Sequence, residues 1–161
     1  EGESQVWQGR GAEMLGLSGQ AQAGRFQDLL AGRVTPGQTA ARGSTRADSK
    51  SRIGIDFTFS APKSVSILAL VGGHSVLVEA HDRAVTKVME LVEQQARARQ
   101  KSAGVTHEER TGNLIIAKFR HETTREQDPA LHTHAVIMNL TRRADGQWRA
   151  LSNEAIIKMT G

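Results

Sequence analysis

The sequence predicts an α+β protein in which an antiparallel β-sheet carries helices packed on one face. Two observations support this class. A strand candidate at 53–59 is followed by two helical segments, and further strand candidates then succeed one another at 113–122, 131–142 and 147–152. The second observation is the dipeptide DG at 145–146, which is a strong turn signal for a hairpin between the last two strands.

The first strand candidate, RIGIDFTFS, alternates apolar side chains with small or polar ones, which places Asp56 on the face opposite the phenylalanines. A helix is expected to follow, with Ser60 as its N-cap, Pro62 in its first turn and its end at the glycine pair 72–73. Apolar residues at three- and four-residue steps then predict a longer helix from 75 to about 101.

Composition and length are those of a folded globular domain, with 161 residues, 38% of them hydrophobic and 24% charged, so we expect residues 1–161 to form a single domain. The first residue is Glu1 and the last stretch, ALSNEAIIKMTG, stops as a helix begins, so we expect a longer polypeptide truncated at both ends. The lack of cysteine excludes disulfides and cysteine-bound zinc. No apolar run is long enough to span a membrane. The net charge of +4 is explained equally well by a polyanionic partner such as nucleic acid and by a slightly basic surface.

Two histidines stand two residues apart in the strand candidate at 131–142. Because such residues point to the same face of a strand, His132 and His134 project together, and His121 lies opposite them if the preceding strand pairs antiparallel. Three neutral imidazoles with open coordination positions are typical of a catalytic metal site, in which the ion acts as a Lewis acid on a phosphoryl oxygen. An isolated His-x-His pair is more often coincidence, so the third histidine is what favours metal.

Asp56 has two interpretations. A carboxylate on an edge strand can simply face water. Alternatively, an acid inside an otherwise apolar strand needs a partner, and Asp56 then orients or deprotonates a nucleophile or holds a ligating histidine in its correct tautomer.

Five cations are candidates for contact with DNA phosphates: Lys63, Arg120, Arg125, Arg142 and Arg143. Lys63 stands near the start of a helix, where backbone N–H groups favour phosphate. Arg120 and Arg125 lie on either side of His121, although regular alternation points Arg120 to the opposite face. For the pair 142–143 in the hairpin, turn solubility explains the charges as well as phosphate contact does.

Three segments resemble a known family: WQGRGAEMLGLSG, GIDFTFSAPKSVSILALVGG and GNLIIAKFRHETTREQDPALHTHAVIMNLTRRADGQWRALSNE. They are similar to the relaxase domain of conjugative plasmid transfer proteins, the tyrosine relaxases of the His-hydrophobic-His endonuclease superfamily. The resemblance covers nearly the whole chain. It implies a palm-like antiparallel sheet flanked by helices, of which residues 1–161 would form the central part.

The resemblance also implies an activity: metal-dependent, site- and strand-specific nicking and rejoining of single-stranded DNA at a plasmid origin of transfer through a 5′-phosphotyrosine. The family's metal ligands fall on His121, His132 and His134, and its strand aspartate falls on Asp56. One divalent ion is implied, with magnesium or manganese in use and zinc, nickel or copper also able to bind. The implied partners are single-stranded and hairpin DNA and conjugation accessory proteins, for a monomer in the bacterial cytoplasm.

The sequence departs from the family in one respect, because it contains no tyrosine. We expect the nucleophilic tyrosines to lie upstream of Glu1, which would leave this fragment inactive alone. Two alternatives stay open: a non-catalytic module that binds a DNA hairpin, and a metal phosphodiesterase that uses water.

Overall fold

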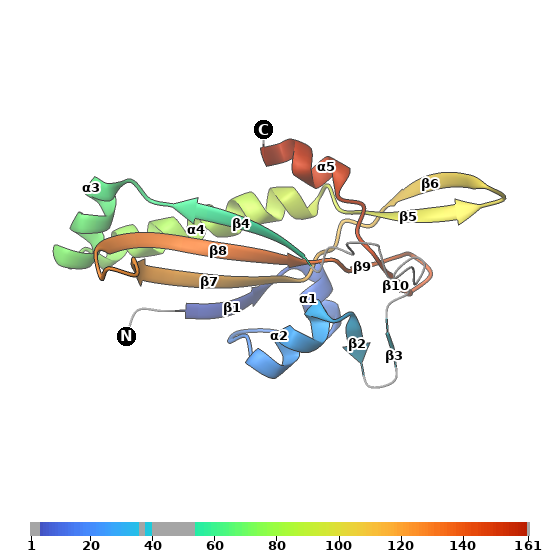
Figure 1. Cartoon of the computed structure of the whole chain (residues 1–161), viewed down its shortest axis with the longest axis horizontal. Helices are drawn as coiled ribbons and strands as arrows, with labels where there is room; N and C mark the ends of the chain where they lie inside the picture. Colours follow the sequence, from blue (N-terminus) through green and yellow to red (C-terminus); the bar gives the residue numbers. More distant parts are fainter. Residues whose placement is uncertain (1–3, 36–37, 40–53, 161) are drawn as a thin grey trace.

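The computed structural model describes residues 4–35, 38–39 and 54–160. Its centre is a four-stranded antiparallel sheet in the order β1-β7-β8-β4, which confirms the predicted class (Figure 1). Residues 40–53, which include Ile53 of the first strand candidate, lie outside the described residues. The sheet strands are β1 (Ser4–Gln8), β4 (Gly54–Ser60), β7 (Ile116–Thr123) and β8 (Pro129–Met138).

Helices cover the two faces of this sheet unequally. The long helix α4 (Ser75–Glu93) runs along one face and packs its buried side on Ile116 and Ile137 (Figure 1). The short helices α1 (Arg10–Met14) and α2 (Ala23–Leu30) pack on the opposite face, so helices are present on both.

The helix after Pro62 ends at the predicted glycines. It begins as α3 (Lys63–Ser66) and continues as the wider π-helical turn η1 (Ile67–Val71), and Gly73 then adopts φ +70°. This φ value lies in the left-handed region that glycine enters without steric cost.

The predicted end of the long helix at about 101 is wrong, because α4 ends at Glu93. The chain then turns and forms β5 (Arg97–Ser102), which pairs antiparallel with β6 (Val105–Arg110). Ala103 and Gly104 form the connecting turn with φ +50° and +77°, the positive values that a two-residue hairpin loop needs. Strand pairing across this turn therefore overrides the helical spacing of residues 97–101.

The predicted hairpin at 145–146 is confirmed, although its strands are short. Gly146 has φ +83° there. The remaining elements are β2 (Arg33–Thr35), β3 (Gln38–Thr39), β9 (Thr141–Arg142), β10 (Trp148–Arg149), α5 (Glu154–Ile157) and η2 (Lys158–Thr160).

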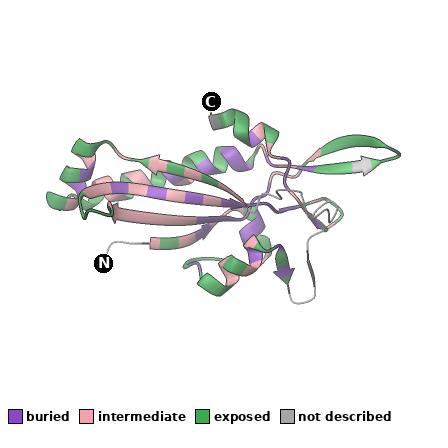
Figure 2. Cartoon of the chain, viewed as in Figure 1, coloured by how far each residue is buried: buried purple, intermediate pink, exposed green. Residues whose placement is uncertain are grey.

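Burial along β8 follows the alternation of a strand that is covered on one side. Figure 2 shows buried and half-buried residues alternating along it, and the two histidines are among the half-buried ones. Among the described residues, no helix is both long and apolar enough to cross a membrane.

Candidate metal centre

Strand register brings the three predicted histidines together. His121 and His132 are directly opposite each other in the β7–β8 ladder, and His134 is opposite Phe119 in the same ladder. The three rings share one face at one end of the sheet, with centres 5.3 Å (His121–His132), 5.6 Å (His132–His134) and 5.9 Å (His121–His134) apart. The sequence predicted that His121 lies opposite the His132/His134 end of the next strand, and the β7–β8 register confirms this arrangement.

Two of these rings have a defined tautomer. Nδ1–H of His132 donates to the carbonyl oxygen of Ala130 at 2.8 Å. Nδ1–H of His134 donates to the carboxylate of Asp56, 3.1 Å from Oδ2 and 3.3 Å from Oδ1. Because these oxygens can only accept, Nδ1 is the donor in both rings, and in the neutral form of each imidazole Nε2 carries the lone pair that can bind a metal.

Three imidazoles are suitable ligands for a divalent ion, but their ring centres stand slightly further apart than in a bound site. Among the described residues, no group of three or more histidine, cysteine or carboxylate side chains is placed so that it could hold a metal ion as it stands. Three imidazoles that bind one ion through Nε2 at about 2.1 Å have their centres roughly 5 Å apart. The spacing of 5.3–5.9 Å is slightly wider. The ring centres therefore lie within about 1 Å of the spacing that one shared ion requires.

Asp56 satisfies both interpretations of its strand position. It lies on the edge strand β4, where its side chain is 52% exposed, yet its carboxylate also accepts the Nδ1 proton of His134. Thr58, two residues further along the same face, places its hydroxyl 3.3 Å from the same nitrogen. The period of two along β4 is the sequence signal that links these residues, and sequence reasoning did not use it for Thr58.

The comparisons with known proteins agree with this geometry. The family model of the TrwC relaxase matches residues 1–161. This chain belongs to the TrwC relaxase family. It is 43% identical over 152 residues to the multifunctional conjugation protein TraI of Escherichia coli (strain K12), a match that covers 94% of the chain and 8% of TraI.

Solved structures of the conjugative relaxase TrwC are closely similar. The metal-free complex of TrwC with OriT DNA superposes with a TM-score of 0.93 at 59% identity over 98% of this chain and 56% of that one. The complex with a 27-mer DNA comprising the recognition hairpin and the cleavage site has 60% identity over 97% of this chain and 56% of that one, with a TM-score of 0.93. A copper-bound complex has a TM-score of 0.94 at 59% identity and covers 98% of this chain and 54% of that one. The chain thus spans about half the length of the TrwC chains it matches.

Within this TrwC-type fold, two of the candidate DNA-binding cations lie at the histidine end of the sheet. Lys63, in the first turn of α3, donates from Nζ to the carbonyl oxygen of Pro129 at 2.9 Å, just before the histidine segment of β8. Arg125 is exposed in the turn between β7 and β8. Arg120, as alternation predicts, is on the opposite face and forms an ion pair with Asp82 of α4.

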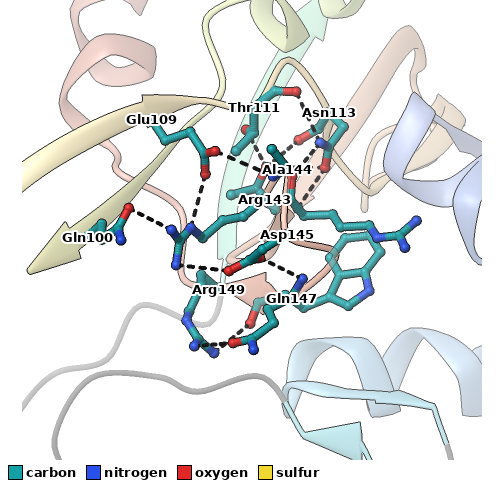
Figure 3. Close-up of polar contacts among 12 residues, drawn as sticks. Gln100, Glu109, Thr111, Asn113, Arg143, Ala144, Asp145, Gln147 and Arg149 are labelled. Atoms are coloured by element: carbon teal, nitrogen blue, oxygen red, sulfur yellow. Dashed lines mark hydrogen bonds and ion pairs between the residues drawn. The ribbon is translucent and has the colours of Figure 1, made fainter.

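The other two cations lie beyond the far end of β8. Arg143 is only 13% exposed, and its guanidinium contacts Glu109 at 3.0 Å, Gln100 at 2.6 Å and Asp145 at 3.5 Å (Figure 3). These contacts join the β9–β10 turn to the β5–β6 hairpin and neutralise the charge. The neighbouring Arg142 is exposed and donates from Nε to Gly146. DNA contact by either arginine stays a prediction. The contacts of Arg143 hold the β9–β10 turn against the β5–β6 hairpin.

Three further histidines, His74, His81 and His107, stand outside this cluster. His74 and His107 are exposed. His81 is half-buried in α4 and hydrogen-bonds through Nε2 to Thr133 Oγ1 at 2.9 Å, a partner 52 positions away. Burial lowers the pKa of this imidazole. Its role could not be read from the sequence, because the contact depends on how α4 lies across the sheet.

Proposed function

We propose that this chain is the metal-binding core of a conjugative relaxase that nicks and rejoins one strand of DNA at a plasmid origin of transfer. The observation that carries the proposal is the set of three histidines on one sheet face with Asp56 fixing the ring of His134. Membership of the TrwC relaxase family supports it, as do the TrwC complexes with OriT DNA.

His121, His132 and His134 would hold one divalent ion, which supplies Lewis-acid polarisation of a phosphoryl oxygen when bound. We assign magnesium or manganese as the working ion, with substrate and water oxygens completing its shell. Zinc, nickel and copper also suit imidazole ligands, and TrwC itself has been solved with copper. Asp56 keeps the proton on Nδ1 of His134, so that Nε2 stays available. Lys63 and Arg125 add positive charge at this end of the sheet for phosphate contact.

The nucleophile would be a tyrosine oxygen that attacks the scissile phosphorus. The bond from phosphorus to the 3′-oxygen breaks, the 5′-phosphate stays on the tyrosine and a free 3′-hydroxyl leaves. Since these 161 residues contain no tyrosine, the group must come from elsewhere. Ser4 pairs with Arg120, next to His121, so a segment upstream of β1 would enter the sheet at the histidine end.

The proposal also covers partners and setting. Single-stranded and hairpin DNA would be bound by a monomer in the bacterial cytoplasm, together with conjugation accessory proteins. The matches to TraI and to the TrwC–DNA complexes support the DNA part.

A calorimetric titration with manganese tests the metal site on the chain itself. The unmutated chain and the control His107→Ala, in the exposed β5–β6 hairpin, should each show one saturable site. His132→Ala and His134→Ala should lose it while keeping the circular dichroism of the folded chain. A folded chain that binds no manganese, or a His134→Ala variant that binds normally, would contradict the proposal.

A second experiment separates the three candidate activities. The chain is fused to the tyrosine-bearing N-terminal segment of a TrwC relaxase and mixed with OriT single-stranded DNA. A covalent adduct in denaturing gels that requires the added tyrosine supports the relaxase. Cleavage by the tyrosine-free chain without an adduct would indicate a water-using phosphodiesterase. DNA binding without cleavage by either chain, indifferent to chelator, would indicate a binding module.

A further inference from the structure

The sheet carries two polar side chains directly behind the three histidines. Arg120 and Thr133 are opposite each other in the β7–β8 ladder, and both point toward α4. Each is a chain neighbour of a histidine, because Arg120 precedes His121 and Thr133 stands between His132 and His134. Two residues further along the same face, Lys118 donates to the hydroxyl of Thr86 in α4 at 2.8 Å, and the rest of the α4 side of the ladder is apolar.

Consecutive residues of α4 bind these two side chains. His81 hydrogen-bonds to the hydroxyl of Thr133 at 2.9 Å, and Thr133 is only 3% exposed. Asp82 forms an ion pair with Arg120. One turn of α4 therefore contacts both strands of the ladder immediately behind the metal ligands.

Apolar packing is incomplete at this place. A cavity of about 270 Å³ lies between α4 and the sheet, and Asp82, Val85, Lys118, Arg120 and Thr133 are among the residues that line it. Where a core is filled, close packing fixes the positions of strands. Beside the cavity the strands have fewer apolar contacts, so their positions depend more on polar contacts with α4.

We propose that His81 and Asp82 are positioning residues, which fix β8 and β7 from behind so that the three imidazoles keep the spacing a metal ion needs. The inference rests on the proposed metal site. Its physical basis is covalent, because Thr133 stands between His132 and His134 in the chain and a displacement of its backbone carries both histidines with it. Since the rings already stand 5.3–5.9 Å apart, further spreading would weaken binding.

The test compares isosteric variants in manganese calorimetry on the whole chain. Thr133→Val removes the hydroxyl and keeps the shape, Thr133→Ser keeps the hydroxyl, and Asp82→Asn removes the charge that pairs with Arg120. Glu90→Gln, which changes an exposed acid on the same helix, is the matched control. We expect Thr133→Val and Asp82→Asn to weaken binding about three- to tenfold, less than the roughly 10- to 100-fold loss typical of direct partners of metal ligands. Thr133→Ser and Glu90→Gln should bind like the unmutated chain.

A metal-free readout keeps this test separate from the proposed function. The ring Cε1–H signals of His132 and His134 in nuclear magnetic resonance should shift or broaden in Thr133→Val and recover in Thr133→Ser, and those of His121 should change in Asp82→Asn. If the unmutated chain binds manganese and both altered variants bind it equally well, the positioning role is overturned. If no chain binds manganese, the metal proposal fails and the ring signals decide alone: unchanged signals overturn the positioning role. Should Thr133→Val not fold, Asp82→Asn, whose site is partly exposed, supplies both readouts.

Discussion

The two ends of the β7–β8 pair differ in what holds them in place. At the end away from the histidines, Ile116, Ala135 and Ile137 have no exposed surface and pack on Met89 and Val92 of α4. This end is a filled core of the kind that carries most of a domain's stability.

At the other end, the three histidines are half-exposed and a cavity lies behind them. Hydrogen bonds and an ion pair from His81 and Asp82 take the place of apolar packing. Partial exposure leaves ring nitrogens accessible to an ion and a phosphate, which a filled core would exclude. The comparison predicts that substitutions at the apolar end change stability, and that substitutions at the histidine end change binding.

The largest effect should follow from Ile137→Ala. Its side chain is 0% exposed, so the loss of its buried methylene and methyl groups, together with the cavity left behind, should cost about 3 kcal/mol of unfolding free energy. Urea denaturation measures this cost. Manganese affinity of the molecules that remain folded should not change.

The control is Ile157→Ala in α5, where the same chemical change occurs at a side chain that is 41% exposed. It should cost less than about 0.5 kcal/mol, as surface substitutions usually do. If Ile137→Ala reduced manganese affinity as strongly as a histidine variant, the two ends would not be independent.

Glu93 gives the second prediction, since it is a buried carboxylate at the apolar end. It accepts backbone N–H groups from Arg10 at 2.7 Å and Leu114 at 2.9 Å, and burial raises its pKa. Glu93→Ala leaves both donors without this acceptor and should cost about 2 kcal/mol or more. Glu93→Gln keeps an acceptor and should cost much less in the same denaturation measurement.

The pH dependence of Glu93 has a defined sign. A carboxyl whose pKa is raised in the folded state gives stability that is fully present below the ordinary glutamate value of 4.5 and is lost as pH rises through the raised value. The unfolding free energy of the unmutated chain should therefore fall relative to Glu93→Gln as pH rises above 4.5. A constant difference between the two chains across this range would contradict burial as the cause.

The contrast between the two ends also explains what the sequence could predict. Alternation along a strand places His132 and His134 on one face, and a single antiparallel pairing adds His121, so strand periodicity and one pairing are sufficient to bring the three histidines together. The long helix was extended too far because residues 97–101 keep a helical spacing, and only pairing with β6 shows that they are a strand. The partners of Arg143 and Thr133 are 34 and 52 positions away, and local pattern contains no information at that range.

Asp56→Asn should have the third largest effect, and it should be an effect on binding. The carboxylate that accepts Nδ1–H of His134 is replaced by a neutral amide, and losing such a partner typically costs about tenfold or more in metal affinity. Stability should change little because the side chain is 52% exposed. Calorimetry and denaturation on the same preparation measure both quantities. Asp28→Asn, an exposed acid paired with Arg33 away from the histidines, is the control and should leave manganese affinity unchanged.

The smallest effect is expected from Thr58→Val, which tests the second acceptor near His134. The Thr58 hydroxyl is 3.3 Å from Nδ1, whereas Oδ2 of Asp56 is 3.1 Å away and is charged. Since charge-assisted hydrogen bonds are roughly twice as strong as neutral ones, Asp56 should dominate, and Thr58→Val alone should weaken manganese binding by less than about threefold.

Combining Thr58→Val with Asp56→Asn sharpens this prediction through a double-mutant cycle. If the hydroxyl takes over the Nδ1 proton once the carboxylate is gone, the double variant should lose more affinity than the sum of the two single losses. Additive losses would mean that the Thr58 hydroxyl does not replace the carboxylate as the acceptor of Nδ1–H. A Thr58→Val loss as large as that of Asp56→Asn would make the hydroxyl the principal acceptor, and Asp56 would then be left facing water, as its position on the edge strand also allows.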